Sequence, residues 1–140
     1  MISPEDRWEI ADLLSKYCLA ADTRELGLLD EVFTHDIECV FQTGSCSGIE
    51  DVRTFMASVL DRLTATQHNV TTSLVTATEA GAQGRTHLIV QHVRTGTDGG
   101  DTYAMGGTYH DLFRREAAGW RICRRELVGS WRVGNPAVMR

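Results

Sequence analysis

Hydrophobic residues in the first part of the chain recur at intervals of three and four, the spacing that places them on one face of a helix. Ser3, followed by a proline and two acidic residues, is typical of a helix start, because the hydroxyl caps free backbone amides and the acids face the positive end of the helix dipole. The apolar stripe continues to Asp22, where we predict that the helix ends. A shorter helical stretch is expected over residues 26–33. A third helix is predicted after Ser47–Glu50, which has the sequence of a capping box, and its apolar stripe extends to Leu63.

The rest of the chain has the alternating and β-rich patterns of strands. Residues 36–41 form the first such segment, and a loop is expected between Gly44 and Gly48. From about residue 68 onward come long β-rich runs joined by short turns, so neighbouring runs are predicted to pair as hairpins in an antiparallel sheet. These runs are residues 68–78, 82–94, 102–115 and 120–132.

A pair of glycines, Gly106 and Gly107, lies inside the third of these runs. Glycine within a strand often marks a bulge that bends the sheet. Helices followed by a meander of strands predict an α+β fold, in which a curved antiparallel sheet wraps around the N-terminal helices and leaves a cavity.

The composition is that of one globular domain spanning residues 1–140, since a chain of this length buries about two thirds of its unfolded surface. The net charge of −5 opposes both a phosphate backbone and an anionic bilayer, so neither nucleic acid nor a membrane is an expected partner. The sequence lacks a basic segment followed by an apolar run, and no stretch approaches about 18 apolar residues, so a cytoplasmic location is expected. The four cysteines form no CxxC pair and are interpreted as reduced structural thiols.

His68 stands where the third predicted helix gives way to the first long strand, in phase with Val70, Thr72 and Leu74 on what we predict is the inner face. Asp22 stands at the C-terminal end of a helix, where the helix dipole disfavours a carboxylate. Two interpretations are open for each residue. His68 is either a core histidine with one hydrogen bond or a general base, and Asp22 is either a solvated turn acid or the carboxylate that orients the imidazole.

Tyr17 belongs to the apolar stripe five residues before Asp22, so its buried ring is either a core residue or a general acid. Arg125 is in phase with Leu127, whereas Ile122 lies in the opposite phase of the same strand. An arginine close to an apolar region holds either a substrate carboxylate or oxyanion, or an internal acid in a salt bridge.

The remaining histidines are weaker candidates. His87 and His92 point to opposite faces of one strand, so they cannot share a ligand on it. His110 directly follows Tyr109, so at most one of these two readily reaches a cavity. No HxH, HExxH or paired-cysteine spacing is present, and no metal is therefore expected.

Taken together, the chain resembles the nuclear transport factor 2-like superfamily, in the SnoaL-like branch that includes scytalone dehydratase, bile-acid dehydratase and hexachlorocyclohexane dehydrochlorinase. The resemblance extends over nearly all of the chain. It implies a cone-shaped half-barrel with an internal pocket for a small-molecule substrate. The segments that carry it are residues 17–22, 66–69, 106–115 and 119–125.

The resemblance also implies roles for single residues. Asp22 and His68 match a dyad in which the histidine abstracts a proton from the substrate, and Tyr17 matches a tyrosine of the dehydratase pattern. Arg125 corresponds to an arginine of the late strand in the dehydrochlorinase. The residues expected to contact the substrate in the pocket are Cys39, Phe41 and Tyr109, together with His110, whose alignment stays open.

The resulting prediction is a cofactor-independent lyase or isomerase of the dehydratase or cyclase type, acting on a small apolar or polyketide-like substrate. In it, His68 oriented by Asp22 is the general base, and Tyr17 or Arg125 stabilises the anion. A homo-oligomer is expected, by resemblance a trimer rather than a dimer, because the outer face of an open sheet needs cover. The alternative is a noncatalytic ligand-binding or accessory protein that resembles the β subunit of ring-hydroxylating dioxygenases.

Overall fold

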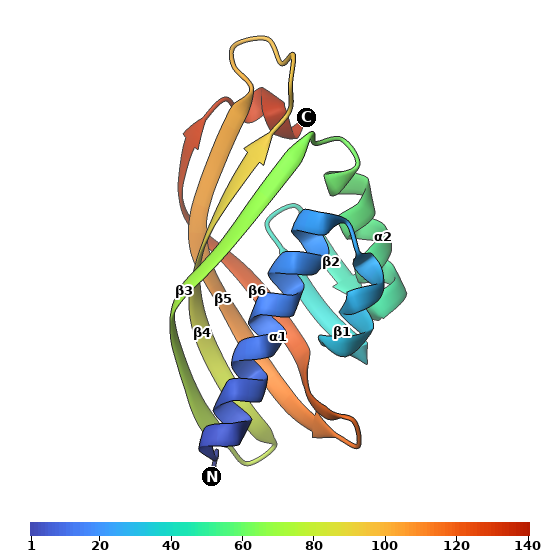
Figure 1. The fold of residues 1–140 in the computed structure, drawn as a ribbon, viewed down its shortest axis with the longest axis vertical. Coiled ribbons are helices and arrows are strands. Elements are labelled where there is room, and N and C mark those ends of the chain that lie inside the picture. The colour runs from blue at the N-terminus through green and yellow to red at the C-terminus, as the bar shows by residue number, and fades with distance from the viewer.

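The computed structural model describes residues 1–140 as a long, curved, six-stranded sheet with helices against one of its faces (Figure 1). Neither α-helix combines the length and the hydropathy that a membrane span requires. The helices are α1 (Pro4–Thr23) and α2 (Ile49–Leu60), with the short 3-10 helices η1 (Leu26–Glu31) and η2 (Pro136–Met139). The strands are β1 (Phe33–Phe41), β2 (Gly44–Ser47), β3 (Ala65–Thr78), β4 (Gly81–Val93), β5 (Thr102–Glu116) and β6 (Gly119–Gly134).

The strands lie in the order β2-β1-β6-β5-β4-β3. Hairpins join β3, β4, β5 and β6 in succession, as the short turns predict, and these neighbours are antiparallel. β1 pairs with β6 in parallel, so the expectation of a wholly antiparallel sheet is wrong at this pair. The two strands are far apart in sequence, and no hairpin turn fixes their relative direction. The fold is α+β, and its curved sheet does not close into a barrel.

The first helix begins where the sequence predicts. Ser3 and Asp6 form a reciprocal capping box at its start. The Asp6 carboxylate also accepts a hydrogen bond from Trp120 Nε1 at 3.0 Å and pairs with Arg115, which ties the start of α1 to the β5–β6 hairpin. One face of the helix presses onto the sheet through Ile10, Leu13, Leu14, Tyr17, Cys18 and Ala21, all of which are buried.

The segment before α2 differs from the prediction. The expected loop between Gly44 and Gly48 contains strand β2, whose Cys46 is buried opposite Cys39 of β1. The predicted capping box is absent, because Ser47 belongs to this strand and its hydroxyl donates to Glu38. Gly48 is the N-cap residue and has a φ of +88°, a backbone conformation that favours glycine.

The helical segment between α1 and the sheet is also shorter than expected. Of residues 26–33, only Leu26–Glu31 are helical, as the 3-10 helix η1. Phe33 already belongs to β1, which therefore begins three residues before the expected Asp36. The buried Phe33 side chain therefore belongs to the sheet, and its ring meets that of Tyr17 of α1 edge-on, with 5.7 Å between the centroids.

Strand β3 starts at Ala65, so His68 lies within it and not at its beginning. His68 and Val70 face inward and are partly buried, as predicted. A bulge between Val70 and Ser73 then reverses the alternation, so Leu74 is 69% exposed and Val75 is the residue packed against the core. The phase prediction was therefore wrong for Thr72 and Leu74, which are both exposed.

A similar irregularity changes the last strand. Phe113 of β5 pairs with Ile122 of β6, but the next residue back, Leu112, pairs with Arg124, so Cys123 is the additional residue. Arg125 consequently shares the inner face with Ile122, and both are fully buried. A further irregularity lies at Gly106 and Gly107, where the two glycines predicted one.

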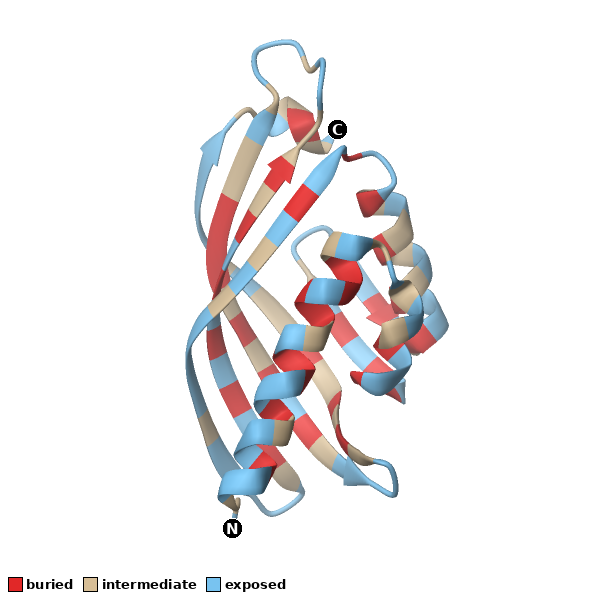
Figure 2. Ribbon diagram, viewed as in Figure 1, coloured by how far each residue is buried: buried red, intermediate tan, exposed pale blue.

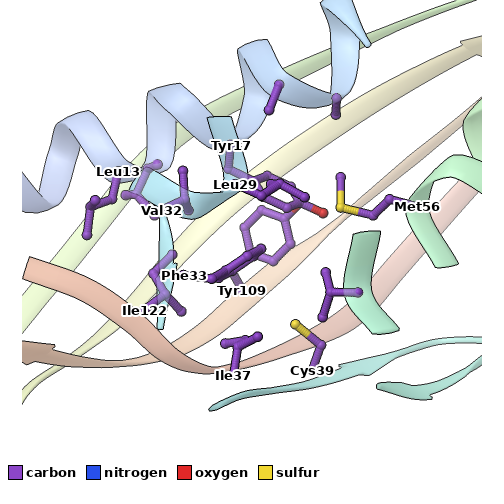
Figure 3. Packing of buried hydrophobic residues seen from close by; sticks show 14 of the residues in the cluster. Leu13, Tyr17, Leu29, Val32, Phe33, Ile37, Cys39, Met56, Tyr109 and Ile122 are labelled. Atoms are coloured by element: carbon purple, nitrogen blue, oxygen red, sulfur yellow. The ribbon is translucent and has the colours of Figure 1, made fainter. Parts of the chain in front are cut away.

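The buried residues follow the contact between the helices and the inner face of the sheet (Figure 2). Tyr17 of α1 and Tyr109 of β5 meet within this buried contact, with Phe33 beside them (Figure 3). The polar groups of the candidate site lie around this aromatic cluster.

Candidate functional site

A cavity of about 400 Å³ lies between α1, α2 and the inner face of the sheet. Its lining is mostly hydrophobic and comes from both ends of the chain, from Tyr17 and Ala21 of α1 to Met139 of η2. His68 of β3 projects into it. An apolar cavity with a few polar groups is typical of a small-molecule site.

The sequence-predicted partner of His68 is beside it. His68 Nδ1 lies 2.6 Å from Asp22 Oδ1, and the backbone N–H of His68 donates to Asp22 Oδ2 at 2.8 Å. The Thr66 hydroxyl donates to Asp22 Oδ1 at 3.0 Å, and Arg24 in turn donates to that hydroxyl at 3.0 Å. Both carboxylate oxygens are therefore held in place, and the imidazole is held by the carboxylate.

These contacts also determine the charge of Asp22. Burial raises the pKa of the Asp22 carboxyl, but the hydrogen bonds from His68 and Thr66 outweigh burial and lower the pKa below its ordinary value. An ionised Asp22 can only accept a hydrogen bond, so Nδ1 of His68 carries the proton. The other ring nitrogen, Nε2, then carries the free lone pair. In this tautomer His68 is equipped to accept a proton.

Tyr17 and Tyr109 both line the cavity next to His68, the position expected for Tyr109. The Tyr17 ring meets the His68 ring edge-on at 6.1 Å between centroids and the Tyr109 ring at 5.8 Å. Burial raises the pKa of the Tyr17 hydroxyl to about 12, although the positive charge of Arg125 opposes this. Tyr17 therefore stays protonated at neutral pH and presents a hydrogen-bond donor.

Arg125 lies outside the cavity. Its guanidinium makes two 2.8 Å hydrogen bonds to Asp111, and both side chains are almost completely buried. It lies 3.7 Å from the ring centroid of Tyr109 and 4.5 Å from that of Tyr17. Burial lowers the pKa of Arg125, but the Asp111 carboxylate raises it more. The interpretation of Arg125 as a salt-bridge partner is thus the observed one, and the direct contact with substrate is a wrong prediction.

The other predicted contact residues divide between the two faces of the sheet. Phe41 lines the cavity and stacks on Phe55 of α2, with 4.8 Å between the ring centroids. Cys39 is buried in the core but does not line the cavity, and burial raises the pKa of its thiol to about 12. His110 lies on the opposite face, in a hollow of about 580 Å³ that also includes Arg85. The predictions for Cys39 and His110 as pocket residues are therefore wrong, and for His110 the reason is the alternation of β5.

His92 of β4 is a pocket residue that the sequence analysis set aside. It is buried, lines the cavity, and has Nδ1 at 3.0 Å from the backbone oxygen of Tyr103. That bond assigns the proton to Nδ1 and leaves Nε2 as an acceptor. Burial lowers the pKa of His92, so the ring is neutral at neutral pH. Its phase with the apolar residues Leu88 and Val90 is the signal that could have identified it.

The cavity contains no arrangement for a metal ion. No group of three or more His, Cys, Asp or Glu side chains is placed to bind one. Apart from four exposed polar residues of the lining, Gln42, Thr43, Ser58 and Arg62, the polar groups are two imidazoles and two phenols in a mostly apolar space. Together the imidazoles and phenols can move a proton and hold an oxygen.

Comparison with known proteins gives the family of the chain. A family model for the SnoaL-like domain matches residues 3–126. The chain belongs to the SnoaL-like domain family. No protein with a curated description matches it by sequence.

Solved structures of similar proteins share the fold of this SnoaL-like domain over nearly its whole length. The Kfla4162 protein from Kribbella flavida is 25% identical, with a TM-score of 0.87 and 96% of each chain covered. A protein from Novosphingobium aromaticivorans, provisionally named an aromatic ring hydroxylase, is 25% identical, with a TM-score of 0.84 and 100% of each chain covered. Hexachlorocyclohexane dehydrochlorinase LinA-type3 from Novosphingobium barchaimii is 18% identical, with a TM-score of 0.81, and 93% of this chain and 90% of that chain are covered. The dehydrochlorinase therefore shares the fold of this domain.

Proposed function

We propose that this SnoaL-like domain is a cofactor-independent lyase or isomerase in which His68 removes a proton from a carbon atom of a small substrate. The observation that carries the proposal is the 2.6 Å contact between His68 Nδ1 and Asp22 at the wall of an apolar cavity. A histidine with one nitrogen held by a carboxylate and the other facing a cavity has the arrangement of a general base.

The proposed reaction is an elimination of water. His68 Nε2 takes a proton from the carbon, the C–H electron pair becomes a new double bond, and the C–O pair leaves with the oxygen. The leaving oxygen takes a proton from the Tyr17 phenol, and the imidazolium returns its proton to the tyrosinate through solvent, so the substrate loses only water. If the proton returns to a different carbon, the same site catalyses an isomerisation.

Two further groups suit a substrate that carries a hydroxyl. The neutral His92 ring presents an Nε2 acceptor for a substrate O–H, and Tyr17 presents a donor for a developing oxyanion. The surrounding wall is mostly hydrophobic, and an apolar environment strengthens each of these hydrogen bonds in the transition state. The substrate is therefore proposed to be a mostly apolar β-hydroxy ketone or a related carbon acid that fits about 400 Å³.

The rival function is a noncatalytic ligand-binding or accessory protein, as the resemblance to hydroxylase subunits suggests. The test uses a panel of cyclic β-hydroxy ketones incubated with the protein in D₂O and followed by mass spectrometry. We expect loss of water, or deuterium exchange at the acidic carbon, for at least one member of the panel.

Substitution of His68 then distinguishes a catalytic base from a residue that only binds the ligand. His68→Gln should lower the rate by about 10²–10⁴-fold and leave the ligand Kd within a few-fold, because a base acts mainly in the transition state. His110→Gln is the matched control: it makes the same change on the outer face and should leave the rate unchanged. Binding of panel members without elimination or exchange in the wild type would contradict the proposal and favour the rival.

A further inference from the structure

The mouth of the cavity differs from its interior. Four lining residues are exposed, namely Gln42, Thr43, Ser58 and Arg62, and all four are polar. No aspartate or glutamate lines the cavity. The mouth therefore carries one permanent charge, the guanidinium of Arg62, and that charge is positive.

Arg62 is held in place but keeps its binding groups free. It follows the C-terminal end of α2, and its Nε donates to the backbone oxygen of Ser58 at 3.1 Å. Its two terminal nitrogens make no hydrogen bond or salt bridge. Arg53 of α2 differs in this respect, because one of its terminal nitrogens binds Asp30 and Glu50 and the other donates to the backbone oxygen of Leu26. The two terminal nitrogens of Arg62 can therefore donate side by side, an arrangement that suits a carboxylate.

The interior below Arg62 suits the apolar part of the same ligand. Phe41 and Phe55 are stacked on one another at the wall, and both are partly exposed to the cavity. A flat ring system lying against this pair would extend from the mouth toward His68. One ligand can thus contact the positive mouth, the aromatic wall and the base.

We propose that Arg62 is a specificity-determining residue that binds an anionic substituent, such as a carboxylate, on an amphipathic substrate. The inference rests on the proposed function only in that the bound molecule is a substrate. The preference for an anion is a property of the pocket itself. An exposed ion pair contributes modestly, so the anion is expected to bind about 3–10-fold more tightly because of Arg62.

The test compares two fluorescent probes with the same apolar skeleton. 8-Anilinonaphthalene-1-sulfonate carries an anion, and N-phenyl-1-naphthylamine lacks it. Arg62→Gln should weaken binding of the sulfonate by about 3–10-fold and leave the neutral probe unchanged, while Arg62→Lys should fall between. Arg85→Gln, which removes an arginine from the outer face, is the control for net charge and should change neither Kd. Raising the ionic strength should weaken the sulfonate selectively in the wild type.

The remaining outcomes are also decisive. Val59 lines the cavity from α2, so Val59→Trp should fill it and weaken both probes. Sulfonate binding that survives Val59→Trp would place the anion site elsewhere and overturn the proposal, as would an Arg62→Gln variant that changes both probes equally or neither. Because these measurements need no turnover, failure at Arg62 leaves the elimination test intact, and failure of elimination leaves the anion preference intact.

Discussion

Replacing Asp111 by asparagine should destabilise the protein strongly, because it removes the only carboxylate that pairs with the Arg125 guanidinium. Asp111 accepts two 2.8 Å hydrogen bonds from Arg125, whose side chain has no exposed surface. The variant keeps the shape of the side chain and removes its charge. The buried guanidinium is then left among Tyr17, Tyr109 and Phe33, whose rings face it but cannot neutralise it.

The magnitude follows from the burial of the pair. Breaking a buried ion pair from one side costs about 3–5 kcal/mol, because the remaining charge has lost its solvation and its partner. A chain of 140 residues has an unfolding entropy of about 0.3 kcal/mol/K, so a loss of about 4 kcal/mol lowers Tm by about 14 °C. A domain with a stability of about 5–15 kcal/mol survives this loss at room temperature, so the variant is measurable.

The measurement is urea unfolding followed by circular dichroism, with Asp36→Asn as the matched control. Asp36 also pairs with an arginine, Arg114, at 2.8 Å, but the two side chains are 69% and 42% exposed. The same chemical change at this exposed pair should cost only about 0–1 kcal/mol. Similar losses for Asp111→Asn and Asp36→Asn would refute the argument from burial.

A double variant distinguishes charge from packing. Combining Asp111→Leu with Arg125→Met replaces both charges by apolar groups and should recover most of the stability lost in Asp111→Asn. If the double variant is as unstable as the single one, the loss comes from disrupted packing and the explanation by a stranded charge is wrong.

Two further predictions concern pH and assembly. The pKa of Asp22 is lowered in the folded state, so below the ordinary value of 3.8 the unfolded chain binds more protons than the folded one. The contribution of Asp22 to stability is therefore present above pH 3.8 and lost as the pH falls below it. Urea unfolding of wild type and Asp22→Asn should accordingly converge as the pH is lowered below 3.8. We also propose a homo-oligomer, a trimer rather than a dimer, that covers the outer face of the sheet. Light scattering should detect this oligomer, and Leu112→Glu should dissociate it. A wild-type monomer at micromolar concentration would contradict the proposal. The exposed apolar side chains on the sheet that motivate this are Leu74, Ile89, Leu112, Val128, Trp131 and Val133.

The helices and the hairpins were predictable because their signals are local. The capping box at Ser3, the apolar stripe of α1 and the glycine-containing turns each lie within a few residues of the structure they specify. Strand β2 was not predictable in this way. Its four residues carry no alternating pattern long enough to recognise, and they become a strand only because β1 lies beside them. The parallel pairing of β1 with β6 has no local signal either.

The candidate site shows the same division. Asp22 was singled out by its place at the end of a helix, His68 by its phase along a strand, and both by family resemblance. The two side chains are in contact, as expected. His92 was a weak candidate because it and His87 point to opposite faces of one strand and cannot share a ligand on it. Looking for a ligand shared with His87 cannot identify a histidine that lines the pocket without His87, beside a residue of β3. His92 pairs across the sheet with Thr66, the residue whose hydroxyl supports Asp22, so the two imidazoles share one wall.

Arg125 demonstrates why residue phase along a strand fails at long range. Counting by twos along β6 separates Arg125 from Ile122, yet the additional residue Cys123 brings both to the inner face. One inserted residue therefore decides whether a permanent charge faces solvent or lies under the pocket floor. Because the guanidinium then needs a partner, the same insertion accounts for Asp111, an aspartate in a buried position of β5. The charge that results lies directly beneath Tyr17 and Tyr109, where it opposes the effect of burial on the pKa of each phenol. The charge of Arg125 thus acts on the proposed acid, Tyr17, from a fully buried position.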